Sequence, residues 1–289
     1  MHGYYFTDNQ TTDAKYSHLS SLTRLLFGLF CLTFASFSDF SDAGTDQPTG
    51  GSYGLALDPV PTVNFVFLTP SNTQQQQAKD IIQHSSILAT IKQLSQTRYI
   101  FAPSVDIVFG SDTGPNFDLT QQQIQIPYQY INQLLQQITT TGAYPTQQQR
   151  YQATTDALLL TLLHEIGHAY ILDRAIPILG SSETTVDNFV VILLLNDIHR
   201  GDEIAINAYQ IFSKQALNNS ILSNNSFIQQ HSLSQQRYQH IVCLVYGSNP
   251  ARYQRVFDSL SLTQRQQQQR QCRDIYSTTY AGWLYYLDN

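Results

Sequence analysis

Two histidines and a glutamate lie within the five-residue sequence HEIGH, at positions 164 to 168. Residues four positions apart share one face of an α-helix, so His164 and His168 point toward the same place. This spacing suits tetrahedral zinc, whose nitrogen ligands lie about 2.0–2.1 Å from the metal. Glu165 follows the first histidine, and its carboxylate can take a proton from a zinc-bound water. The motif therefore predicts a zinc (Zn2+) site that activates water for hydrolysis.

A catalytic zinc site needs a third protein ligand and a fourth position for water. Glu183 follows His168 by fifteen residues, and Asp187 comes four residues later, in the pattern E-x-x-x-D. Only three of the 21 acidic residues are glutamates, so two glutamates at these two motifs are informative. We expect Glu183 to be the third ligand and Asp187 to accept the spare N–H of a ligand imidazole. The reverse assignment, with Asp187 on the metal, stays open.

Peptide hydrolysis also needs a donor for the negative charge that develops on the carbonyl oxygen. We expect His231 to be that catalytic donor, because it precedes a helix that Ser232 can cap and a loop can aim it at the site. Arg237 can clamp a substrate carboxylate or pair with an aspartate, and Tyr238 is a further candidate. Residues 116–126 can supply an edge strand along which a peptide substrate lies.

The zinc motif lies in a predicted helix over about residues 147–174. Its leucines occur almost all round the helix, which is typical of a buried central helix. A proline and a glycine separate it from the next helix, which Ser181 or Ser182 can cap and which runs to about residue 196.

The remaining elements follow from hydrophobic periodicity and turn signals. We expect strands at 62–68, 104–110, 116–119 and 123–126, and helices at 72–96 with a break near 84–86, at 128–139, 203–217, 232–246, 250–259 and 263–287. A small sheet packed on a mostly helical body predicts an α+β fold, with one domain over residues 62–289.

The composition indicates a folded chain and excludes one class of partner. The net charge is −6, and the charged fraction of 12% is about half of that in ordinary soluble domains. Thirty-five glutamines fill the difference, but 18 tyrosines and 15 phenylalanines among aliphatic runs favour a packed core. Because the sequence has no basic patch, we expect no nucleic-acid partner. The oligomeric state stays open.

The N-terminal region predicts export. Residues 25–37 form an uncharged run of thirteen, shorter than the roughly 20 residues of a membrane-spanning helix. We expect residues 1–38 to be a signal peptide, with an uncleaved membrane anchor as the alternative. Residues 39–61, rich in Gly, Pro, Asp and Ser, then form a flexible linker. The exported chain would be periplasmic or extracellular.

Export would leave two cysteines in the mature chain, Cys243 and Cys272. An even pair in an oxidising compartment predicts one disulfide. Two buried free thiols are the alternative.

The chain also resembles a bacterial family of uncharacterised exported proteins described as metallopeptidases. The resemblance rests on HEIGHA, on E-x-x-x-D after a leucine-rich link, on His231-Ser232-Leu233 with Gln236-Arg237, and on the segments 243–250 and 272–276. It implies a minimal zincin-like fold in which Glu183 is the third ligand, as in gluzincins.

These features predict an exported zinc-dependent metallopeptidase that acts on a peptide or protein substrate, with Glu165 as the general base. Two other functions could use the same site: a non-catalytic zinc-binding envelope or interaction protein on a zincin scaffold, and a zinc amidase that acts on cell-wall material. Glu165 distinguishes the first of these, because a protein without activity has no physical reason to keep a buried carboxylate beside its metal.

Overall fold

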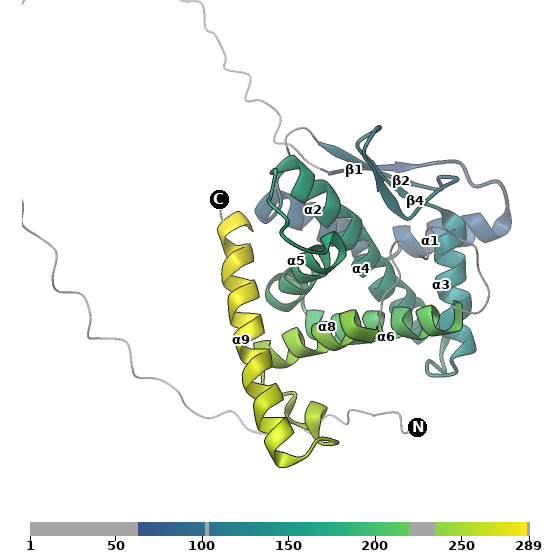
Figure 1. Ribbon diagram of the computed structural model, residues 1–289. Helices are drawn as coiled ribbons and strands as arrows, with labels where there is room; N and C mark the ends of the chain where they lie inside the picture. The colour runs from purple at the N-terminus through teal and green to yellow at the C-terminus, as the bar shows by residue number, and fades with distance from the viewer. Residues whose placement is uncertain (1–62, 102–103, 220–234, 288–289) are drawn as a thin grey trace, which may run out of the picture. The chain divides into compact units, whose positions relative to one another are not determined.

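The computed structural model describes residues 63–101, 104–219 and 235–287 (Figure 1). The predicted signal peptide, the predicted linker and His231 lie outside these ranges. The elements are β1 (Val63–Phe67), α1 (Thr73–Gln83), α2 (Ile87–Thr97), β2 (Val105–Phe109), β3 (Asn116–Asp118), β4 (Gln123–Ile126), α3 (Tyr128–Thr140), α4 (Gln147–Asp173), α5 (Ser182–Asp197), α6 (Gly201–Asn219), α8 (Gln235–Ser248), the 3₁₀ helix η1 (Gln254–Phe257) and α9 (Leu262–Leu287). Among these described helices, none is both long and apolar enough to cross a membrane. Helices predominate beside one small sheet, so the fold is α+β, as predicted.

The sheet is mixed and has the strand order β1-β2-β4-β3. β1, β2 and β4 are parallel, and β3 pairs antiparallel with β4 at one edge. Parallel neighbours need a crossover connection, which α1 and α2 supply between β1 and β2. Val105, Ile107 and Phe109 alternate with partly exposed residues, so one face of β2 packs into the core. The edge strand β3 contacts α4.

Helix α4 is the central helix of the fold (Figure 1). It begins with a capping box, in which the Thr146 side chain accepts from the Gln149 backbone N–H and the Gln149 side chain accepts from the Thr146 N–H. Every residue from 156 to 167 is buried, because α4 contacts α3, α5, α6 and the sheet. The first four residues of HEIGH therefore lie inside the core, and His168 is partly exposed.

The chain leaves α4 through a Schellman motif. The Ile176 N–H donates to the carbonyl of Ile171 and the Ala175 N–H to that of Leu172, while Ala175 adopts a left-handed φ of 48°. Ser181 then caps α5, because its side chain accepts from the backbone N–H of Thr184. The chain therefore ends α4 at Asp173 and begins α5 at Ser182, after a short connection.

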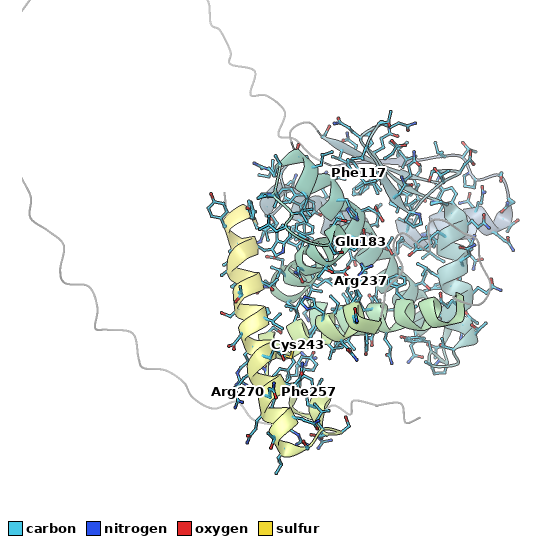
Figure 2. All side chains as sticks on the ribbon, viewed as in Figure 1. Phe117, Glu183, Arg237, Cys243, Phe257 and Arg270 are labelled. Atoms are coloured by element: carbon cyan, nitrogen blue, oxygen red, sulfur yellow. A yellow bond between two sulfur atoms is a disulfide. The ribbon has the colours of Figure 1, made fainter. Side chains whose placement is uncertain are left out.

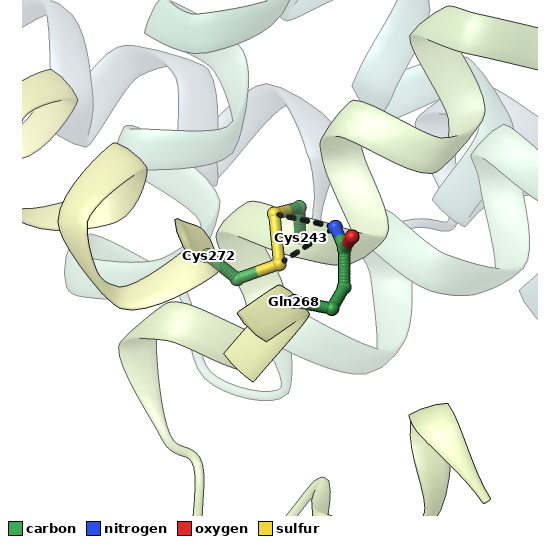
Figure 3. The surroundings of a disulfide bond; sticks show 3 residues. All are labelled: Cys243, Gln268 and Cys272. Atoms are coloured by element: carbon green, nitrogen blue, oxygen red, sulfur yellow. Dashed lines mark hydrogen bonds between the residues drawn. A yellow bond between two sulfur atoms is a disulfide. The ribbon is translucent and has the colours of Figure 1, made fainter. Parts of the chain in front are cut away.

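Helices α8 and α9 are joined by the predicted disulfide between Cys243 and Cys272 (Figure 2, Figure 3). Gln268 donates to the sulfur of Cys272 over 3.5 Å. A Cβ on Gly247 would lie 2.4 Å from the carbonyl oxygen of Cys272, so only glycine permits this close approach of the two helices.

Removing this disulfide should destabilise the protein without unfolding the site. The bond closes a loop of 29 residues, and on the chain-entropy account its loss lowers the free energy of unfolding by about 3.6 kcal/mol. Urea denaturation of a Cys243→Ala/Cys272→Ala variant measures this difference. A reductant should destabilise the wild type similarly and leave the double variant unchanged. Equal stability of wild type and variant would show that the bond constrains nothing.

The prediction of a helix at residues 250–259 is wrong. The segment instead holds turns and the short helix η1. The Tyr253 hydroxyl donates to Asp202 over 2.5 Å, and Arg252 pairs with Asp202 at 3.0 Å and with Glu203 at 2.7 Å. These contacts with the first turn of α6 fix the segment in a conformation that its own helical propensity does not favour.

Candidate metal centre

Three side chains from two helices meet at one point: His164 and His168 of α4, and Glu183 of α5. The Nε2 atom of His164 lies 3.3 Å from Nε2 of His168 and 3.2 Å from Oε2 of Glu183. Nε2 of His168 lies 3.3 Å from Oε1 of Glu183. Tetrahedral ligands that each lie 2.0–2.1 Å from zinc are about 3.3 Å apart. The three residues therefore fit a zinc ion, and among the described residues they form a cluster that could hold a metal ion.

Asp187 lies behind His164 and away from this cluster. Its Oδ1 atom is 3.3 Å from Nδ1 of His164, the ring nitrogen opposite Nε2. Tyr209 donates its hydroxyl to the same oxygen over 2.9 Å, and the Asp187 side chain is only 2% exposed. A carboxylate in this position orients the ring and fixes which nitrogen is available to a metal. Glu183, and not Asp187, lies on the Nε2 side of both histidines.

Arg237 of α8 contacts both Asp187 and Glu183 of α5, and Figure 2 shows it beside Glu183. Its Nε atom donates to Asp187 Oδ2 over 2.6 Å, and Nη2 donates to Oδ1 over 2.8 Å. Its Nη1 atom lies 3.5 Å from Oε2 of Glu183. Of the two roles considered from the sequence, the structure shows the pairing with an aspartate. The guanidinium offsets negative charge that would otherwise be costly to bury.

Hydrogen bonds and neighbouring charges shift the pKa values of His164 and Asp187 more than burial does. Burial alone would lower the pKa of His164, but the hydrogen bonds to Asp187 and Glu183 raise that pKa to about 9. Burial alone would raise the pKa of Asp187, yet His164 and Arg237 lower it below its usual value. Asp187 is therefore ionised at neutral pH and can only accept hydrogen bonds, as an orienting carboxylate must.

Glu165 is held by the edge strand of the sheet. The backbone N–H of Phe117 in β3 donates to its Oε2 over 2.9 Å, and the residue is only 2% exposed. Glu165, His168 and Glu183 line one cleft of about 800 Å³. The carboxylate of the expected general base therefore faces the same space as two of the expected metal ligands.

Gly167 permits the close contact between α4 and α5. A Cβ at this position would lie 2.9 Å from Phe189 Cδ1 and 2.9 Å from Val186 Cγ1, closer than side chains pack. The glycine of HEIGH therefore lets α5 approach α4, and this approach brings Glu183 to the histidines.

The predicted oxyanion donor His231 lies outside the described residues, and its catalytic role stays a prediction. Tyr238 packs its ring against the hydrophobic core, and burial raises the pKa of its hydroxyl.

The model of one protein family, described as "Putative metallopeptidase", matches residues 67–287. The chain belongs to this family. The match spans strands β2, β3 and β4, both helices of the metal cluster and the disulfide, and it confirms the resemblance found in the sequence. No curated protein and no solved structure matches the chain. The description of the family suggests metallopeptidase as the class of activity, and the roles of single residues rest on their geometry.

Proposed function

We propose that the protein is an exported, zinc-dependent metallopeptidase with a minimal zincin-like fold. The observation that carries this proposal is the approach of His164, His168 and Glu183 to within 3.2–3.3 Å of one another, beside the buried carboxylate of Glu165. The donor set, two imidazoles and one carboxylate, is that of a catalytic zinc site with a position left for solvent. The metallopeptidase family supports peptide bonds as the target.

His164, His168 and Glu183 would hold the metal. When bound, zinc supplies a Lewis acid that polarises a carbonyl and lowers the pKa of a water molecule. Asp187 keeps the ring of His164 oriented through Nδ1, and Arg237 keeps Asp187 and Glu183 in place.

Glu165 acts as the general base and then as the general acid. It accepts a proton from the attacking water and donates it to the leaving amine. Phe117 holds one oxygen of the carboxylate through its backbone N–H, so the other oxygen can exchange the proton. A non-catalytic zinc protein would have no use for a buried carboxylate held in this way.

Two observations support export. The disulfide between Cys243 and Cys272 fits an oxidising compartment. The uncharged run at residues 25–37 has the length of the apolar region of a signal peptide.

Metal removal tests the proposal. The purified chain should contain one zinc ion and cleave members of a mixed peptide library. An excess of 1,10-phenanthroline should reduce cleavage to background, and one equivalent of zinc per protein chain should restore it after the chelator has been dialysed away. A serine-protease inhibitor serves as the control and should have no effect. Peptide cleavage that persists after all metal is removed would contradict the proposal.

A further inference from the structure

The cleft beside the metal cluster is lined by both polar and apolar residues. Among the described residues that line it, the ionisable ones are Glu165, His168 and Glu183, which belong to the site itself. The apolar lining comes from two places: Phe117 and Leu119 in and after β3, and Ile171 and Leu172 at the end of α4 with Ile176 in the turn that follows.

Leu172 lies on the same face of α4 as His168, one helical turn further along. Four residues advance an α-helix by about 6 Å, and one residue of an extended peptide spans about 3.3 Å. Leu172 is therefore within reach of a side chain one or two residues from a peptide bond that lies at the cluster. Although α4 is mostly buried, Leu172 is 51% exposed.

Leu119 provides a second exposed apolar side chain in the same cleft. It follows β3 and is 66% exposed. Single exposed leucines are common on protein surfaces. Here, however, Leu119 and Leu172 come from different elements and line the cleft that holds Glu165.

We propose that Leu119 and Leu172 form a subsite for an apolar substrate side chain next to the scissile bond. This inference rests on the proposed peptidase function and names its substrate class: peptides with a residue of the size of leucine or phenylalanine at that position. Binding would bury the apolar surface of such a side chain and of the two leucines, and removing that surface from water is favourable. An acidic side chain there would meet the carboxylates of Glu165 and Glu183, and no lysine or arginine is among the described residues of the lining.

Matched peptides test the subsite. Blocked hexapeptides Ala-Ala-Gly-Xaa-Ala-Ala, with Leu, Phe or Asp as Xaa, are compared by kcat/KM. One methylene group in a hydrophobic pocket changes kcat/KM by about 10- to 200-fold, so the Leu and Phe peptides should exceed the Asp peptide by at least about tenfold. Leu172→Asp and Leu119→Asp should each remove this preference. Leu262→Asp is the matched control, since Leu262 is 74% exposed at the start of α9 and does not line the cleft.

Binding separates a failure of the subsite from a failure of the peptidase function. The same peptides, fluorescently labelled, are titrated into the zinc-loaded Glu165→Gln variant with and without Leu172→Asp. If no peptide is cleaved but the Leu peptide binds tighter and loses this advantage with Leu172→Asp, the subsite stands and the peptidase function fails. If neither cleavage nor binding favours Leu over Asp, or if Leu172→Asp behaves like Leu262→Asp, the subsite is wrong.

Discussion

Replacement of Glu165 by glutamine should lower kcat by about 10²- to 10⁴-fold, the usual contribution of a general base, while zinc stays bound. Glutamine has nearly the same volume, and its side-chain oxygen can still accept the Phe117 N–H that now holds Oε2. The amide cannot take a proton from water at neutral pH. The packing of α4 and the metal ligands should therefore be unchanged, and only the proton transfer should be lost.

Zinc content and kcat on the best library peptide measure this prediction together. Asp173→Asn is the matched control, because it removes a carboxylate from the end of the same helix at a residue that does not line the cleft. It should keep both zinc and activity. Full turnover in Glu165→Gln would exclude a general-base role, and loss of zinc would assign Glu165 to the metal instead.

Replacement of Glu183 by alanine should remove zinc and, with it, all peptide cleavage. The carboxylate lies 3.2 Å from His164 and 3.3 Å from His168, so its loss leaves only two protein ligands. Loss of a residue that only orients a ligand weakens metal binding by about 10- to 100-fold. Loss of Glu183 itself should weaken it further. Zinc affinity by competition with a chromogenic chelator measures the change.

Two variants on α5 control for this result. Thr184→Ala, next to the ligand in the first turn, should bind zinc like the wild type. Asp187→Asn should weaken zinc binding by about 10- to 100-fold and should also lower stability, because it removes the buried carboxylate that accepts two hydrogen bonds from Arg237. If Glu183→Ala keeps its zinc and Asp187→Asn loses it, the ligand role belongs to Asp187.

Short-range patterns in the sequence predict the helices that carry the site. The i, i+4 spacing of His164 and His168 is local, as are the leucines around them and the capping residues at Thr146 and Ser181. The strands could be predicted from alternation in the same way. The disulfide could be predicted from the two cysteines that remain when the predicted signal peptide is removed, because an even pair allows one bond.

Contacts between distant segments could not be predicted from these patterns. Phe117 and Glu165 are 48 residues apart, and Arg237 and Asp187 are 50 apart. Each pair meets only because the sheet and α8 pack against α4 and α5, and local periodicity carries no information on that packing. The order of the other strands and the contact between β3 and α4 are properties of the same kind.

Anomalous diffraction from zinc-loaded crystals of the full chain, recorded on both sides of the zinc absorption edge, locates the metal most directly. We predict a single peak about 2.0–2.1 Å from Nε2 of His164, Nε2 of His168 and a carboxylate oxygen of Glu183. The absence of a peak at this cluster, or a zinc ion bound by Asp187 in place of Glu183, would contradict the assignment of the metal centre.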